Sequence, residues 1–268
     1  MTRSLALQVE LQVSAVQAKG LAKRYGQLVV LSNIDLTILP GERVAVAGPS
    51  GSGKTTLLYL LAGLIQPDGG SLSLVGRDLA KIGPGRELSE LVGIIYQQFN
   101  LVPHLPVVHN VLAGRLGQWG ILRSIISLVS PRDREMVQGA LAQLGIGDKI
   151  NERTSRLSGG EQQRVAIARL MVQTPRIVLA DEPVSSLDPA RAAEIIQVLT
   201  GLASESGGTL VASLHSPDLI RKYFTRVIGL REGVLQFDLP AEQLNGPVLE
   251  ALYDLERNGS DQVESPVF

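Results

Sequence analysis

The sequence predicts an α/β fold with a helical insertion and a β-rich edge. Three observations carry this prediction. Short apolar runs, of the kind that form buried parallel strands, alternate with longer segments of helical periodicity. Between about residues 100 and 170 the periodicity is mainly helical. Towards both ends, short strand-like segments follow one another with turn residues between them, which favours antiparallel strands beside a helix-covered sheet.

The composition permits a large core and excludes several kinds of site. Of the 268 residues, 44% are apolar, and 25 Lys and Arg balance 26 Asp and Glu, so we expect no nucleic-acid partner. The absence of cysteine excludes disulfides and thiolate metal sites. No apolar run reaches the roughly 18 residues of a membrane span, and the N-terminal residues lack the apolar core of a secretory signal. We therefore expect a soluble, cytoplasmic protein that another chain would have to hold at a membrane.

Strand and helix signals place the elements in order along the chain. Apolar residues alternate between residues 5 and 13, as in a strand with one exposed face. Further strands are predicted at residues 28–31, 34–38, 43–47, 71–75, 92–96, 176–180 and 209–213, with a hairpin at 227–237. Helices are predicted at residues 55–65, 132–144, 158–172 and 189–203.

A glycine-rich turn joins the strand predicted at residues 43–47 to the helix at 55–65. Its sequence fits the G-x-x-x-x-G-K-[ST] pattern of a phosphate-binding P-loop. Glycines let backbone N–H groups approach phosphate oxygens, and the helix N-terminus attracts negative charge. Lys54 is expected to reach the terminal phosphates, and the Thr55 hydroxyl to bind Mg²⁺. The predicted nucleotide-binding residues are Gly48, Pro49, Ser50, Gly51, Ser52, Gly53, Lys54, Thr55 and Thr56.

Two carboxylates follow the buried strand predicted at residues 176–180. Asp181 is expected to help position Mg²⁺, because P-loop enzymes place such a carboxylate on a neighbouring strand. Glu182, one residue further, can act as the general base towards an attacking water. The alternative is an exposed acidic turn at the end of a strand. The P-loop elsewhere in the chain favours the catalytic interpretation.

The sequence Leu-Ser-Gly-Gly at the start of the helix predicted at 158–172 resembles the signature of the ATP-binding cassette (ABC) family. The Ser158 hydroxyl, the N–H groups of Gly159 and Gly160, and the helix N-terminus together favour a γ-phosphate. The same residues fit an ordinary capping box closed by Glu161, and both interpretations can hold. Since the chain has its own P-loop, this second site is expected to serve a second copy. The resemblance implies a head-to-tail pair that encloses two ATP molecules.

The resemblance also implies roles for residues outside these motifs. Tyr25 matches the aromatic residue that stacks on adenine. Gln97 matches the glutamine that contacts Mg²⁺ and the lytic water, with Gln98 as its rival. Asp188 lies in the loop that crosses the dimer interface, and His215 matches the histidine that senses the γ-phosphate. The alternative interpretations are that Tyr25 is a partly buried strand residue, that Asp188 is a helix N-cap and that His215 is structural.

The resemblance covers nearly the whole chain and implies a domain organisation. It predicts a P-loop NTPase cassette over residues 13–253, with a RecA-like core, an antiparallel β subdomain and a helical subdomain at about 98–170. Residues 1–12 are expected to form an N-terminal extension or strand, and the polar residues 254–268 a disordered tail. Within the family, residues 110–116 followed by 119–129, residues 130–145 and residues 233–253 resemble the phosphonate importer ATPases, whereas residues 99–105 are shared with many importers of polar solutes. Departures from that pattern follow His215 and occur at Glu161, where glutamine is commoner.

The leading hypothesis is the ATPase subunit of an importer for phosphonate, phosphite or a phosphate ester. Two copies would close on ATP and Mg²⁺ and drive separate permease subunits. An extracytoplasmic solute-binding protein would deliver the solute to the permease. The protein would lie peripherally on the cytoplasmic face of the inner membrane. The apolar residues 119–129 would either pack inside the helical subdomain or line a groove for a permease helix. The alternatives are an exporter or lipoprotein-release ATPase, and a soluble non-transport ATPase; the lack of sustained heptads before the signature argues against the last.

Overall fold

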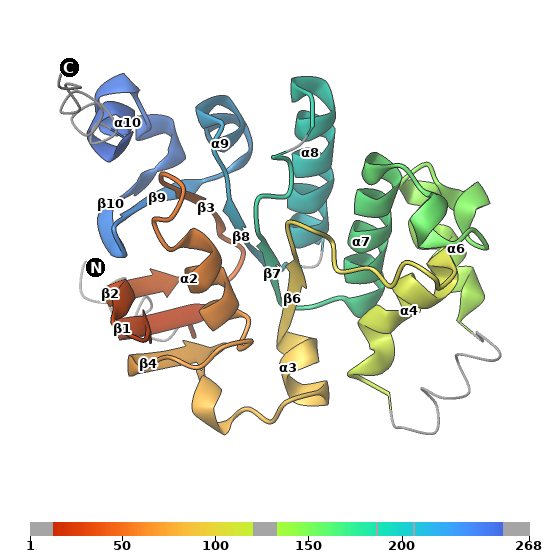
Figure 1. The fold of residues 1–268 in the computed structure, drawn as a ribbon, viewed down its shortest axis with the longest axis horizontal. Coiled ribbons are helices and arrows are strands. Elements are labelled where there is room, and N and C mark those ends of the chain that lie inside the picture. The colour runs from red at the N-terminus through yellow and green to blue at the C-terminus, as the bar shows by residue number, and fades with distance from the viewer. Residues whose placement is uncertain (1–12, 120–132, 186, 206, 254–268) are drawn as a thin grey trace, which may run out of the picture.

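The computed structural model describes residues 13–119, 133–185, 187–205 and 207–253. These residues form two sheets surrounded by helices, which confirms the predicted α/β fold (Figure 1). Most of the strand pattern at 5–13, residues 120–129 of the apolar run, and the tail at 254–268 lie outside the described residues. No helix in the described ranges is long and apolar enough to cross a membrane.

The smaller sheet is antiparallel. Its strands, in spatial order, are β2 (Leu28–Ile38), β1 (Val16–Tyr25), β4 (Gly69–Leu74) and β5 (Arg77–Asp78). The prediction of two separate strands at 28–31 and 34–38 is wrong, because β2 runs through both. Asn33 has a φ of 51°, and the pairing with β1 shifts between Leu31 and Ile34, so an irregularity absorbs the polar interruption without ending the strand. The sequence pattern missed β1 altogether, since polar residues break its alternation.

The larger sheet carries the P-loop. Its strands, in spatial order, are β10 (Val234–Pro240), β9 (Arg226–Arg231), β3 (Arg43–Ala47), β8 (Thr209–Ser213), β7 (Ile177–Ala180) and β6 (Val92–Ile95). All neighbours from β9 to β6 are parallel, and β10 is antiparallel to β9. The carboxyl ends of these parallel strands therefore meet at one edge of the sheet, which is where parallel α/β sheets bind ligands.

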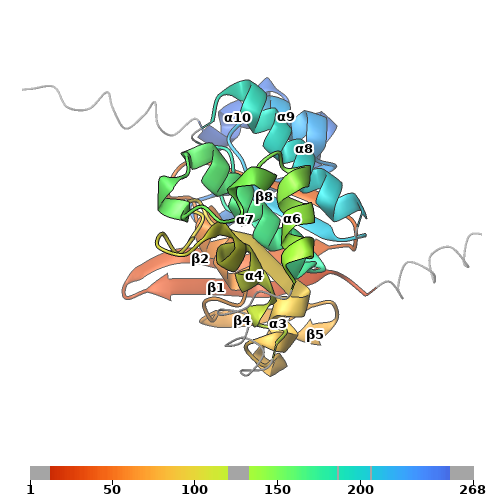
Figure 2. The ribbon, with the colours of Figure 1, turned by 90° about the vertical axis from the view of Figure 1, so that its right-hand side faces the viewer.

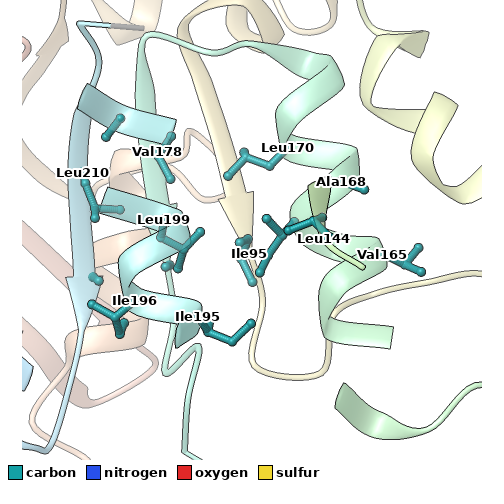
Figure 3. Packing of buried hydrophobic residues seen from close by; sticks show 14 of the residues in the cluster. Ile95, Leu144, Val165, Ala168, Leu170, Val178, Ile195, Ile196, Leu199 and Leu210 are labelled. Carbon is teal, nitrogen blue, oxygen red and sulfur yellow. The ribbon is translucent and has the colours of Figure 1, made fainter. Parts of the chain in front are cut away.

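The alternation of side chains along the buried strands divides the core into two parts. Val44 and Val46 of β3 belong to a cluster that includes one face of the helix after the P-loop and the inner face of the antiparallel sheet. Ala45 and Ala47 belong to the other cluster. There, Leu199 of the helix that follows residue 188 packs towards Val178 of β7 and Leu210 of β8 (Figure 3). The P-loop strand is thus buried on both faces and held from both sides.

Helices cover these faces and form the insertion. The described α-helices are α2 (Lys54–Leu61), α3 (Arg86–Leu91), α4 (Val107–Leu116), α6 (Arg134–Gln143), α7 (Gly159–Gln173), α8 (Pro189–Glu205), α9 (Pro217–Tyr223) and α10 (Gly246–Tyr253). The prediction that the first helix extends to residue 65 is wrong, because Gly63 with a φ of 68° follows its end. α8 to α10 and the antiparallel sheet lie at opposite ends of the molecule in both views (Figure 2).

Candidate functional site

The P-loop leaves β3 and enters α2 in a conformation that depends on glycine. Gly48 has a φ of 154°, and a Cβ atom there would lie 2.0 Å from the Leu230 carbonyl oxygen. Gly53, the residue before α2, has a φ of 103°. The loop therefore lies against β9 with no room for a side chain at its first residue. The free N–H groups of the first turn of α2 follow directly, as a phosphate site requires.

Lys54 folds back over this loop. Its Nζ atom donates to the carbonyl oxygens of Gly48 and Pro49, at 2.9 Å each, and the side chain is only 5% exposed. Burial lowers the pKa of Lys54, while the nearby carboxylates of Glu182 and Asp181 oppose this shift. A buried ammonium with two carbonyl partners is a strong attraction for an incoming phosphate, which can replace them.

Asp181 lies beside the P-loop hydroxyl. It follows β7, and its Oδ1 atom accepts hydrogen bonds from Thr55 Oγ1 at 3.2 Å and from Ser213 Oγ at 3.0 Å. The carboxylate is 1% exposed, and burial raises its pKa although both hydrogen bonds act in the opposite direction. The structure thus brings together the hydroxyl and the carboxylate that were predicted as Mg²⁺ ligands.

This pair of oxygens fits Mg²⁺ better than a transition metal. No group of three or more His, Cys, Asp or Glu residues in the described ranges could hold a metal ion. Mg²⁺ needs no such cage, because it is usually held by one or two protein oxygens together with substrate phosphates and waters. Thr55 and Asp181, next to a phosphate-binding loop, match that pattern.

Glu182 is held by three other residues. Its backbone has a φ of 45°, and its N–H donates to Ser213 Oγ at 2.7 Å. Gln97 Nε2 donates to one carboxylate oxygen at 3.1 Å, and His215 Nε2 lies 2.9 Å from the other. An ionised carboxylate only accepts hydrogen bonds, so His215 is the donor. Of the two glutamines left open by the sequence, the geometry places Gln97 at the carboxylate.

A cavity of ≈ 600 Å³ opens beside this carboxylate. Glu182 and His215 form one wall, and Val184, Leu187 and Leu214 form apolar walls. The side chains of Glu182 and His215 are 20% and 43% exposed. A water molecule can therefore reach the carboxylate, unlike the neighbouring Asp181.

The signature residues Ser158, Gly159 and Gly160 begin α7. Ser158 Oγ accepts from the Glu161 N–H at 3.3 Å, and the Ser158 N–H donates to Glu161 Oε2 at 2.8 Å, which makes a complete capping box. The bond from the Ser158 N–H and a second bond from the Ser158 hydroxyl, both to Glu161 Oε2, lower the pKa of Glu161. Ser158 and Gly159 are exposed, and a Cβ on either glycine would meet nothing within 4 Å. α7 and α2 lie on opposite sides of β6 to β8, so the signature is remote from the chain's own P-loop (Figure 1).

The two other predicted nucleotide contacts lie at the surface. Tyr25 ends β1 with 52% of its area exposed, and Lys23 Nζ lies 5.5 Å from the centre of its ring. Asp188 precedes α8, where its Oδ1 atom accepts from the Arg191 N–H at 3.1 Å. The N-cap interpretation of Asp188 is therefore correct, and an interface role is compatible with it.

Sequence reasoning missed two residues of this site. Ser213 links Asp181 to the Glu182 backbone, and only the parallel pairing of β7 with β8 could have indicated that these residues lie side by side. Tyr253, at the end of α10, lies beside the P-loop, and burial raises its pKa. A cavity of ≈ 250 Å³ lies between α10 and the P-loop.

Comparisons with known proteins agree with this geometry. Residues 31–185 match the ABC transporter family. A protein of Pseudomonas entomophila (strain L48) named Phosphonates import ATP-binding protein PhnC is 45% identical over 250 residues, which is 92% of this chain and 94% of the relative. Phosphonates import ATP-binding protein PhnC 1 of Nostoc sp. (strain PCC 7120 / SAG 25.82 / UTEX 2576) is 42% identical over 243 residues, 89% of this chain and 92% of the relative.

Solved structures show the same fold. The structure titled Dimeric Structure of MJ0796, a Bacterial ABC Transporter Cassette, is 30% identical with a TM-score of 0.75, and the match covers 85% of this chain and all of that one. The cbiO1 protein of Clostridium perfringens, described as part of the transporter complex cbiONQ, is 26% identical with a TM-score of 0.71; that match covers 93% of this chain and 96% of that one.

Proposed function

Since the chain belongs to the ABC transporter family, we propose that it is the ATP-hydrolysing subunit of an importer for phosphonates or a related oxyanion. Two observations support the two parts of this proposal. Glu182, held by Gln97 and His215 beside the P-loop, supports hydrolysis. The 45% identity over 92% of the chain to a protein named for phosphonate import supports the solute class.

The arrangement assigns a part of the reaction to each side chain. Lys54 would exchange the carbonyls of Gly48 and Pro49 for phosphate oxygens. Thr55, Asp181 and Gln97 would hold Mg²⁺, which neutralises phosphate charge when bound. Tyr25 would stack on the adenine, where its exposed ring leaves room for a base.

Glu182 would take the proton from the water that attacks the γ-phosphate. General-base catalysis of this kind contributes about 10²- to 10⁴-fold to a rate. Gln97 and His215 would hold the two carboxylate oxygens so that the remaining lone pairs face the water. His215, exposed beside the cavity, would also sense whether the γ-phosphate is present.

The active unit would be a pair of chains. Ser158 and Gly159 are exposed, and the signature as a whole is remote from the P-loop of its own chain, so it fits a nucleotide bound by a second copy. Asp188 would lie at the same interface. The 30% identical cassette MJ0796 has been solved as a dimer. Permease subunits would dock on the helical subdomain, a solute-binding protein would act on the opposite side, and the ATPase would lie peripherally on the cytoplasmic face of the inner membrane.

Reconstitution with the permease subunits in proteoliposomes tests this proposal. We expect ATP hydrolysis that rises when the binding protein is loaded with a phosphonate, together with uptake of that phosphonate into the vesicles. Inorganic phosphate and phosphite at the same concentrations identify the solute class. Stimulation of ATP hydrolysis by a lipoprotein substrate would favour an exporter or lipoprotein-release ATPase instead. Full ATP hydrolysis without any permease would favour a non-transport ATPase.

A further inference from the structure

The segment that carries Gln97 makes a turn with an unusual exit. The Phe99 N–H donates to the Tyr96 carbonyl at 2.9 Å, so Gln97 and Gln98 occupy the middle of this turn. Phe99 and Asn100 then both adopt the left-handed region, with φ values of 57° and 45°. Phe99 resists this conformation, which glycine and, less readily, asparagine adopt, so a partner outside the turn would stabilise the two residues in succession.

Arg169 on α7 is that partner. Its Nη2 atom donates to the Phe99 carbonyl at 2.7 Å and its Nη1 atom to the Asn100 carbonyl at 2.9 Å. One planar guanidinium thus binds the two consecutive carbonyls that the left-handed residues present. Lysine could not reproduce this, because its ammonium lacks the fixed fork of donors.

The surrounding contacts fix the position of Arg169 itself. A Cβ atom on Gly114 of α4 would lie 2.3 Å from the Arg169 carbonyl oxygen, so the two helices touch at this point. One turn further along α7, Gln173 Nε2 donates to the Val92 carbonyl at 2.8 Å, at the start of β6. α7 is therefore bonded to the start of β6 and, through Arg169, to the segment that follows Gln97. Burial lowers the pKa of Arg169, as expected for a guanidinium held inside the structure.

We propose that Arg169 is a positioning residue for hydrolysis: it holds the Tyr96–Phe99 turn in the form that brings Gln97 to Glu182. The hydrogen bonds of the Arg169 side chain go to the Phe99 and Asn100 carbonyls and not to Glu182, so Arg169 would act through the turn. Because α7 begins at Ser158, the same arginine connects the signature end of α7 to the catalytic carboxylate. This inference rests on the proposed ATPase function and adds a residue outside the motifs described above.

A double-mutant cycle tests the inference in the reconstituted complex. Arg169→Lys should lower kcat about tenfold, since small misplacements of catalytic groups are costly, and leave the affinity for ATP within about twofold. In a Gln97→Ala background, the same substitution should lower kcat no further, because the group that it positions is already absent. Equal losses in both backgrounds would overturn the inference.

Arg164→Lys is the matched control on the same helix. Arg164 also uses its guanidinium as a fork, but its partners are the Leu144 carbonyl at 2.7 Å and Glu194 at 2.9 Å, away from the turn. We expect kcat of this variant to stay within about twofold of the unaltered protein, whatever its melting temperature. A kcat loss equal to that of Arg169→Lys would show a general effect of α7 stability and overturn the inference.

Asn100 provides a second test that leaves Arg169 in place. Asn100 is exposed, so substitutions there should fold. Asn100→Val resists the left-handed conformation and should lower kcat in the same Gln97-dependent way, whereas Asn100→Gly accepts it and should not. Equal kcat for both variants would overturn the inference. The unaltered protein and Glu182→Gln are assayed in parallel. If the unaltered protein does not hydrolyse ATP, the proposed function itself is wrong, and not only the role of Arg169.

Discussion

The P-loop and the signature, the two regions proposed to bind phosphate, are built in opposite ways. At the P-loop, Lys54 and Asp181 are 5% and 1% exposed, and each is held by residues of the same chain. At the signature, Ser158 and Gly159 are exposed, and the partners that the described part of the chain gives the Ser158 side chain are within its own capping box. The P-loop region has its charged groups already in place, whereas in the proposed mechanism the signature only completes the site of a second copy. The difference explains why two copies are needed to hydrolyse ATP in the proposed mechanism.

The largest expected effect follows from Glu182→Gln, which removes the proposed general base beside the P-loop. The amide keeps the shape of the carboxylate but cannot accept the proton of water, so kcat should fall about 10²- to 10⁴-fold. Lys54, Thr55 and Asp181 are unchanged, so ATP should still bind. Two copies joined by two ATP molecules should then accumulate, and size-exclusion chromatography should show a dimer with ATP but not with ADP.

The control for this dimer is the double variant Glu182→Gln with Lys54→Ala, which should stay monomeric with ATP. Hydrolysis by Glu182→Gln at the unaltered rate would mean that Glu182 is not the base, and His215 would become the candidate. If the variant is inactive but monomeric, the same measurement is made in the assembled complex with the permease.

The next effect in size is the loss of nucleotide affinity in Lys54→Ala. Charge-assisted hydrogen bonds contribute about 1.5–3 kcal/mol each, which corresponds to a roughly 10- to 150-fold weaker affinity for ATP. A fluorescent ATP analogue titrated into the purified variant measures this. Arg191→Ala, which removes an exposed cation at the start of α8, is the control and should bind normally. Near-normal affinity of Lys54→Ala would contradict the assignment of the P-loop.

These two predictions concern residues that the sequence grouped by local chemistry and that the structure brings close together. The P-loop and the Asp181-Glu182 pair are continuous in sequence, so their residue types alone indicate phosphate and Mg²⁺. The sequence did not indicate Ser213, because its contacts with Asp181 and Glu182 depend on the pairing of β7 with β8. The choice between Gln97 and Gln98 depends on the conformation of a turn. Likewise, β2 was divided in two because the irregularity at Asn33 is stabilised by its neighbour β1, which no local pattern shows. Contacts between distant segments decided what the sequence left open.

A smaller effect is expected from Ser158→Arg, which places a bulky side chain in the signature. The variant should bind ATP at its own P-loop with unchanged affinity, and its turnover in the assembled complex should fall at least about tenfold. Ser155→Arg places the same side chain on a neighbouring exposed residue and should leave turnover unchanged. Unchanged turnover of Ser158→Arg would contradict a site shared between two copies.

Mixing variants sharpens the comparison between the two regions. Ser158→Arg keeps a complete P-loop, and Lys54→Ala keeps an intact signature. A mixed pair therefore contains one composite site with all its residues. Activity that appears only on mixing would show that the two regions act across chains, whereas activity in neither the mixture nor the single variants would show that both composite sites must act together.

The smallest effect is expected from Ser158→Ala, which tests what the signature hydroxyl does before a partner binds. Loss of an N-cap hydroxyl costs about 1 kcal/mol of stability, and urea unfolding at pH 7 should show this difference. Hydrogen bonds from Ser158 lower the pKa of Glu161 from its ordinary value of 4.5. Because the folded pKa is the lower one, this contribution is fully present above pH 4.5 and is lost as the pH falls through the folded value. The stability difference between Ser158→Ala and the unaltered protein should therefore shrink below pH 4.5.

Ser216→Ala, which removes the cap of α9 without such a glutamate, should show a difference that does not depend on pH in this range. A difference for Ser158→Ala that is equal at pH 7 and below pH 4.5 would show that the hydroxyl does not act through Glu161.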